Sequence, residues 1–202
     1  ERALDTWVCN SGINWQLDKS GTTTGFANDA ECVVLFASLP MGVLAITTSR
    51  YKASGNSNCN LDKTVWYLKE FDIQVTPNEG LGGSLRWNTA TEAPSASQYD
   101  LETVLLHELG HAHGLAHVIN EESVMHFSIG NGSVKRTLES HELEGAAHKM
   151  SFSLTSNCVS TYDPMLVHPG NVDCDNTATP VALANKAQVK VFIEGYYEES
   201  SG

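Results

Sequence analysis

The chain has 202 residues, of which 41% are hydrophobic and 18% are charged, a balance typical of globular domains rather than disordered ones. Its 24 acidic residues outnumber 12 basic ones, and the formal net charge of -12 argues against binding to nucleic acid or anionic membranes. The longest apolar stretch, residues 32–46, contains Pro40 and Gly42 and is shorter than the roughly 20 residues that a membrane span needs. We therefore expect a globular protein without a membrane span, and we predict that it is a monomer.

The first half of the chain predicts one helix followed by short strands. Residues 2–9 carry apolar side chains at helical spacing. Runs rich in β-branched and aromatic residues follow, separated by clusters of Gly, Asn, Ser and Thr. The predicted strands are residues 13–17, 32–37, 43–48 and 65–75, the last with a break near Lys69. Residues 76–97 are predicted to form a long loop, and loops of this length are often functional.

The second half predicts two helices around an irregular stretch. Residues 97–100 are a plausible helix start, and apolar residues then recur along one face up to Leu109. Residues 118–136 lack periodicity, and Ser140 is predicted to cap a helix that runs to about Met150. One helix, several strands and two further helices indicate the α+β class.

Five cysteines in Asn- and Ser-rich surroundings favour disulfides in an oxidising compartment. We predict a Cys158–Cys174 bridge, which would close a short loop. Of the remaining three, Cys9, Cys32 and Cys59, one must stay free or pair outside the chain, and Cys9 is the best candidate for a bridge. The protein is therefore predicted to be secreted or located at the cell surface.

Residues 107–117 read HELGHAHGLAH, the pattern HExxHxxGxxH. On a helix, His107 and His111 differ by about 40° in azimuth and about 6 Å in rise, so both imidazoles can reach one zinc ion. His117 would face away if the helix continued, and it can join them only if the chain turns back. Gly114 permits that turn because glycine tolerates a left-handed backbone. Three histidines leave the fourth position of a tetrahedral zinc open, which is typical of catalytic sites.

Glu108 lies next to the first histidine, and a continuous helix does not let it bind the same ion well. It can instead take the proton of a water that attacks a carbonyl, and then protonate the leaving amine. This chemistry is peptide-bond hydrolysis. The five fixed positions would arise by chance in roughly one such chain in 10⁴, so surface histidines on an ordinary helix are a poor explanation.

Other histidines do not fit the same pattern. His113 is predicted to be exposed or hydrogen-bonded rather than a ligand. The pair His141 and Glu142 lacks a second histidine at position 145, which is Gly, so a solvated helix face is predicted there. His126 could face the cleft and contact substrate.

The motif resembles that of the metzincin zinc endopeptidases, which adds a Met-turn after the third histidine. Met125, within Ser123–His126, lies eight residues after His117 and is identified as the Met-turn candidate. The resemblance implies that it packs beneath the three histidines without binding metal. The runs SQYDLETVLLHELGHAHGLAH, KRTLESHELEGA and KEFDIQV are similar to parts of the matrixins within this clan, and secreted bacterial relatives are the nearest likeness.

The resemblance implies a twisted, mostly parallel sheet with an antiparallel edge strand, an active-site helix, and a small irregular C-terminal subdomain with the Met-turn and a helix. We predict an upper subdomain over residues 1–117 and a lower subdomain over 118–182. Residues 183–202 would be a tail or the start of a further module.

Three features depart from the family. Phe127 stands two residues after Met125, where astacins and serralysins carry a tyrosine, so no tyrosine should approach the zinc. No counterpart of the second, structural zinc site of vertebrate matrixins is present between residues 60 and 100. The five cysteines are also unusual for a matrixin-like domain.

Asn28, Asp29 and Glu31 could contribute to a calcium site, although no EF-hand spacing is present.

A protein or peptide substrate is expected to lie extended in a cleft between the subdomains. We predict that it adds to an edge strand near residues 63–68 and that the 76–97 loop forms a rim. The specificity pocket is expected around residues 127–135, where Phe127 and Ile129 suggest an apolar lining.

The sequence therefore predicts a secreted, zinc-dependent endopeptidase with one catalytic zinc. Two alternatives remain. One is a zinc-bearing binding or adhesion module without turnover, and the other is a zinc amidase that acts on cell-wall peptide.

Overall fold

The computed structural model describes residues 1–13, 15, 17, 26, 28–29, 31–53 and 66–155. The helices in these ranges are α1 (Arg2–Ser11), α2 (Leu101–Ala112) and α3 (Ser140–Thr155), with a 3-10 turn at Asn78–Gly80. The strands are β1 (Val33–Phe36), β2 (Ala45–Ala53), β3 (Trp66–Val75), β4 (Arg86–Asn88) and β5 (Gln98–Asp100). None of these helices combines the length and apolar character that a membrane span requires.

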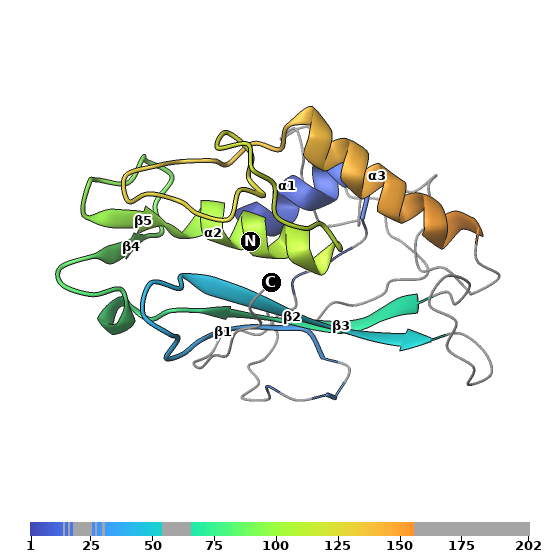
Figure 1. The fold of residues 1–202 in the computed structure, drawn as a ribbon, viewed down its shortest axis with the longest axis horizontal. Coiled ribbons are helices and arrows are strands. Elements are labelled where there is room, and N and C mark those ends of the chain that lie inside the picture. The colour runs from blue at the N-terminus through green and yellow to red at the C-terminus, as the bar shows by residue number, and fades with distance from the viewer. Residues whose placement is uncertain are drawn as a thin grey trace.

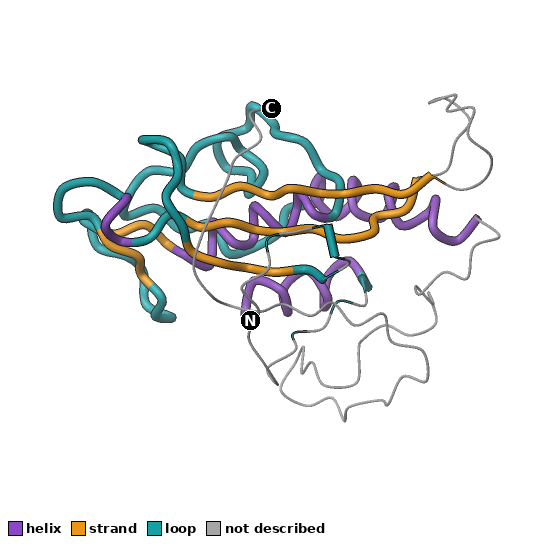
Figure 2. Tube along the Cα trace, turned by 90° about the horizontal axis from the view of Figure 1, so that it is seen from below, coloured by secondary structure: helices purple, strands orange, loops and turns teal. Residues whose placement is uncertain are grey.

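The helices lie on one side of a sheet formed by β1, β2 and β3, with α2 directly above it (Figure 1). The same strands run side by side along the long axis when the molecule is seen from below (Figure 2). This arrangement confirms the predicted α+β class.

The core lies between α1, α2 and the sheet. Trp7 of α1 is fully buried, and its indole N–H donates to the Leu106 carbonyl of α2 at 2.8 Å. Phe71 and Ile73 of β3 complete this cluster from the sheet. Each buried side chain of this size contributes about 1.5–3 kcal/mol through the apolar surface that it removes from water. The first helix is therefore present as predicted, and its apolar side chains pack against α2.

The strand order is β1-β3-β2, with β1 and β3 parallel and β2 antiparallel to β3. The antiparallel edge strand is therefore β2, and the prediction that residues near 63–68 form the edge is wrong. Residues 66–68 belong to the central strand, where they pair with the end of β2. Strand order depends on long-range pairing, which the local alternation of side chains does not encode.

The predicted break near Lys69 corresponds to a register shift rather than to a strand end. Arg50 pairs with Glu70 and Tyr51 pairs with Leu68, so Lys69 is the extra residue of a bulge within a continuous β3. The predicted strands at 32–37 and 43–48 correspond to β1 and β2. Of the predicted 13–17 strand, residues 13, 15 and 17 have no regular structure, and 14 and 16 lie outside the described residues.

The predicted 76–97 loop is partly ordered. It contains the 3-10 turn and β4, which pairs in parallel with β5 just before α2. The Trp87 indole N–H donates to the Thr76 carbonyl at 2.6 Å. This hydrogen bond holds β4 against the end of β3. Parallel pairing over only three residues was not visible in the composition of this segment.

The α3 helix begins at Ser140, as predicted, and continues past Met150 to Thr155. The predicted Cys158–Cys174 bridge and the 183–202 tail lie outside the described residues, and the subdomain boundaries at 117 and 182 remain predictions.

Candidate active site and metal centre

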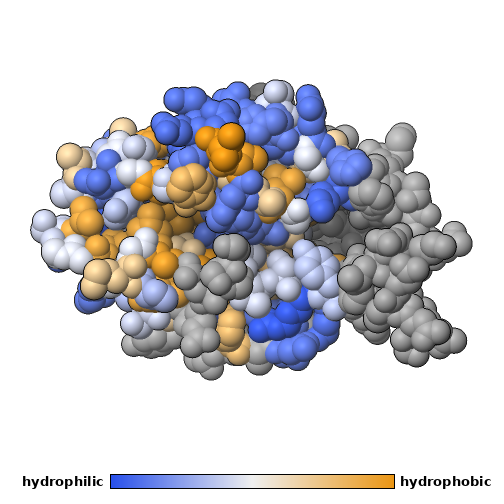
Figure 3. All heavy atoms as spheres, in the orientation of Figure 1, coloured by the Kyte–Doolittle hydropathy of each residue, from blue (hydrophilic) through white to orange (hydrophobic). Residues whose placement is uncertain are grey.

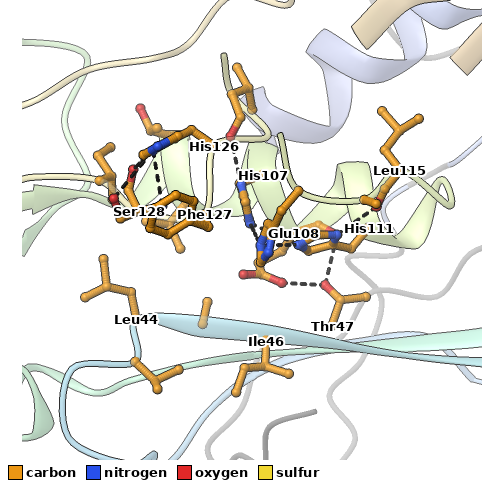
Figure 4. Close-up of a pocket in the computed structure, with 18 of the residues that line it drawn as sticks. Leu44, Ile46, Thr47, His107, Glu108, His111, Leu115, His126, Phe127 and Ser128 are labelled. Atoms are coloured by element: carbon orange, nitrogen blue, oxygen red, sulfur yellow. Dashed lines mark hydrogen bonds between the residues drawn. The ribbon is translucent and has the colours of Figure 1, made fainter. Parts of the chain in front are cut away.

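A cavity of about 990 Å³ lies between α2 and the edge strand β2. Thr47 points up from β2, His107, Glu108 and His111 point down from α2, and Phe127 lies beside them (Figure 4). Its remaining lining comes from residues 42–46, 49, 51, 99, 103–104, 114–117, 124, 126, 128–129 and 135. On this face of the molecule, hydrophobic side chains gather in the left half, where β4, β5 and the start of α2 lie (Figure 3).

The active-site helix is anchored by its N-cap residue, which directly precedes Leu101. Asp100 is its N-cap, and its side chain accepts hydrogen bonds from the Thr103 backbone N–H at 3.1 Å and the Thr103 hydroxyl at 2.7 Å. Its carboxylate also pairs with Arg136 at 2.5 Å. Asp100, the last residue of the predicted helix start, caps the helix, whereas residues 98–100 form β5 rather than a helical turn. A buried ion pair joins this N-cap to the segment before α3.

The end of α2 brings the third histidine to the first two. Helical structure stops at Ala112, and Gly114 has φ +89°, a conformation that favours glycine. The Gly114 and Leu115 N–H groups donate back to His111 and Gly110 carbonyls at 2.8 and 2.9 Å, which closes the helix end. The turn that the motif spacing predicts is thus present.

The Nε2 atoms of the three histidines converge. Those of His107 and His111 are 3.0 Å apart, and each is 3.1 Å from Nε2 of His117. Three nitrogens bound to one tetrahedral zinc would be about 3.3 Å apart. The observed distances fit this geometry with a small outward movement. No other group of three potential metal-ligating side chains occurs among the described residues.

Backbone carbonyls orient two of the rings. Nδ1 of His107 lies 2.7 Å from the Val124 carbonyl, and Nδ1 of His111 lies 2.8 Å from the Leu115 carbonyl. A carbonyl accepts only, so both Nδ1 atoms carry the proton and both Nε2 atoms present lone pairs to the centre. Converging lone pairs repel one another unless a cation lies between them. This donor set therefore suits a metal ion.

Burial keeps these rings neutral. It lowers the pKa of His107 to about 3, with the nearby His111 as the second cause. Burial also lowers the pKa values of His111 and His117. Neutral imidazole is the form that binds metal, so no proton has to leave the rings at neutral pH.

Glu108 is buried, and its carboxylate points toward β2 rather than into the histidine cluster (Figure 4). The Thr47 hydroxyl lies 2.7 Å from Glu108 Oε2 and 2.9 Å from the Glu108 carbonyl, and the shorter contact and the negative charge favour donation of its single proton to Oε2. Thr47 was not predicted from the sequence, because it lies 61 residues away from its partner.

Met125 is buried beneath α2. A Cβ added at Gly110 would overlap the Met125 sulfur, so the helix needs glycine there for the two to pack. The Met125 backbone N–H donates to the Ser123 hydroxyl at 2.9 Å, and that hydroxyl donates to Glu142 of α3. Met125 therefore lies below the histidine-bearing helix, as the Met-turn resemblance implies.

Glu142 corrects one prediction. It is buried rather than solvated, and besides Ser123 it accepts from the Glu139 backbone N–H at 2.7 Å. The neighbouring His141 is exposed. His141 faces solvent and Glu142 faces inward, so this part of α3 is not uniformly solvated. Through Glu142, α3 is hydrogen-bonded to the Met-turn.

The other predicted residues fall into two groups. His113 is buried between Trp7 and Trp15 and lies 3.3 Å from the Ser11 hydroxyl, so it belongs to the core and not to the histidine cluster. His126, Phe127 and Ile129 all line the cavity, with Phe127 exposed.

Two further expectations concern the cavity rim and calcium. None of residues 76–97 lines the cavity, so the predicted rim is wrong, and residues 42–44 occupy the edge beside β2 instead. Instead, the 76–97 segment contributes β4, which pairs with β5. The calcium expectation for Asn28, Asp29 and Glu31 stays a prediction.

A mixed sheet under a histidine-bearing helix, a glycine turn and a buried Met-turn define a metzincin-type zinc peptidase domain. A model of the matrixin family matches residues 13–148, which is well over half of the chain. The chain belongs to the matrixin family, and this membership implies zinc-dependent peptidase activity. No curated protein matches the chain.

Proposed function

We propose that the protein is a secreted zinc endopeptidase in which His107, His111 and His117 hold the zinc and Glu108 is the general base. The observation that carries this proposal is the convergence of three Nε2 atoms, 3.0–3.1 Å apart, in a cavity that also contains the buried Glu108. A binding module would need the ligands but not the carboxylate.

When bound, zinc polarises a carbonyl oxygen and makes water more acidic. Glu108 accepts the proton of the attacking water and then delivers it to the nitrogen of the leaving amine. The Thr47 hydroxyl holds Glu108 Oε2 while this happens. The Nδ1–H bonds of His107 and His111 keep both rings in the tautomer that offers Nε2.

The substrate adds as a further strand to the outer edge of β2. Among the described strands β2 pairs only with β3, and the cavity is lined by residues 45–47 at the start of β2 and by residues 42–44 just before it. Backbone hydrogen bonds along such an edge hold a peptide in an extended form with little dependence on its sequence. The cavity side of β2 therefore replaces residues 63–68 as the expected docking edge.

Cleavage of an unfolded protein distinguishes this proposal from a binding module. We expect hydrolysis by the chain, loss of hydrolysis with a zinc chelator, and recovery when zinc is added back. A chain that binds one zinc but cuts no protein or peptide would contradict the endopeptidase assignment. Hydrolysis of cell-wall peptide alone would favour the amidase alternative.

Secretion is supported by the cysteines. Cys9 is disulfide-bonded, whereas Cys32 is a buried free thiol whose pKa burial raises to about 11. If Cys158 and Cys174 also pair, unfolding without reductant should expose one reactive thiol per chain, and peptide mapping should place it at Cys32. Five reactive thiols in protein purified from its native compartment would contradict an oxidising location.

A further inference from the structure

The cavity contains one lysine. The Lys135 backbone N–H donates to the Thr103 hydroxyl at 2.8 Å, and its ammonium donates to the Ser123 carbonyl at 3.1 Å. Lys135 therefore stretches from the N-terminal half of α2 to Ser123, the first residue of the Met-turn segment. It is half-buried, and no other lysine or arginine lines the cavity.

Lys135 has no acidic partner among the described residues. The ion pairs in this part of the chain involve other cations, and Glu108 is the only carboxylate that lines the cavity. An ammonium has three donors, and one neutral carbonyl satisfies a single donor. Within the part of the chain that the structure describes, the Lys135 ammonium therefore has no carboxylate at ion-pair distance.

The neighbouring walls strengthen the effect of this charge. Tyr99, Val104 and Ile129 line the same cavity and are buried or partly buried, and such largely apolar walls screen a charge less than bulk water does. The rest of the chain is acidic, with a net charge of -12, and would repel an acidic peptide elsewhere. A carboxylate entering this cavity would therefore be attracted to one place.

We propose that Lys135 is a specificity-determining residue that binds the side-chain carboxylate of an aspartate or glutamate directly after the scissile bond. The inference rests on the proposed endopeptidase function and on the location of the specificity pocket around residues 127–135. A charge-assisted hydrogen bond to Lys135 would attract the substrate carboxylate and fix the position of the substrate along the cleft. An apolar side chain could enter the pocket but would leave the ammonium unpaired.

The test uses peptides that are acetylated at the N-terminus and amidated at the C-terminus, so that their only carboxylate is the side chain in question. Members of a set differ only after the scissile bond, where they carry Glu, Gln or Lys, and mass spectrometry verifies the cleavage position. For the wild type we expect kcat/KM to be about tenfold higher with Glu than with Gln. Lys135→Met should abolish this preference, and Lys135→Glu should shift it toward Lys.

Two controls separate charge from folding. Lys149→Met removes an exposed lysine of α3 that does not line the cavity, and it should keep the preference for Glu. Lys135→Arg retains the charge and should keep part of the preference. Thermal unfolding compares the stability of all variants with that of the wild type.

Binding measured by calorimetry on the zinc-loaded Glu108→Gln variant provides a readout that does not need turnover. Tighter binding of the Glu peptide than of the Gln peptide, lost with the added Lys135→Met change, supports the proposal. Equal affinity and equal kcat/KM for Glu and Gln would overturn it, as would a preference that survives Lys135→Met. Absence of cleavage with every peptide, while Glu-specific binding persists, would count against the proposed function alone.

Discussion

The Glu108 carboxylate is contacted by a hydroxyl group from the neighbouring strand. Thr47 faces Ile73 in the sheet register, so its side chain lies on the helix-covered side and reaches Glu108 Oε2 at 2.7 Å. A carboxylate held in one orientation needs less rearrangement before it accepts a proton. Thr47 is thus a positioning residue, because it acts through Glu108.

We predict that Thr47→Val lowers kcat about tenfold and changes KM little, since valine keeps the shape but removes one hydrogen bond to a charged group. Thr47→Ser should restore most of the activity. Steady-state kinetics check this, with zinc content and thermal stability measured in parallel. Wild-type kcat in the valine variant, or a serine variant as slow as the valine one, would contradict the positioning role.

Gly110 of α2 packs closely against the Met125 side chain. Gly110→Ala would drive a methyl group into the Met125 sulfur, and we expect a loss of about 1–3 kcal/mol in unfolding free energy. Combining it with Met125→Ala should make the Gly110→Ala change far less costly. Gly130→Ala, on an exposed loop with only the Ser133 hydroxyl nearby, is the matched control. Urea denaturation compares the wild type, both single variants, the double variant and the control, and additive effects of the two changes would exclude the contact.

Helix α2 is the element that organises the site, and both of its ends are set by local sequence. Asp100 caps its start and Gly114 follows its end. Between them, the two histidines of α2 and Glu108 all line the cavity that faces β2. The ion pair from Asp100 to Arg136 joins the helix start to the chain that leads into α3. Loss of this N-cap would therefore affect both the sheet side and the Met-turn side of the cavity.

The pH dependence of stability tests this N-cap. Hydrogen bonds from Arg136 and Thr103 outweigh burial and lower the pKa of Asp100 below its ordinary 3.8. A carboxyl group with a lowered folded-state pKa stabilises the fold above its unfolded pKa, and this contribution disappears as pH falls through the folded value. Asp100→Asn should therefore cost about 2 kcal/mol at pH 7 and progressively less below pH 3.8.

Urea denaturation of the wild type and Asp100→Asn at several pH values measures this difference. The exposed Glu121→Gln serves as a control that removes one negative charge without touching the helix start. A stability difference that stays constant across the acid range would show that the Asp100 carboxylate is not responsible.

Across the whole molecule, local patterns predicted the catalytic helix well and the long-range partners poorly. The spacing of three histidines and Gly114 predicted their convergence, because helix geometry relates residues that are close in sequence. Thr47 and Glu142 were missed, since their contacts join residues 61 and 19 positions apart and leave no periodic trace. The edge strand was misplaced for the same reason, as the order β1-β3-β2 is not the order of the chain.

In the proposed mechanism, Glu108 transfers protons beside a zinc held by His107, His111 and His117. This role of Glu108 is tested most directly by cleavage of an unfolded protein by Glu108→Gln, with bound zinc measured on the same sample. We predict that kcat falls about 10²- to 10⁴-fold while one zinc per chain is retained. Wild-type turnover by the zinc-loaded variant would contradict the role of Glu108 and with it the proposed mechanism.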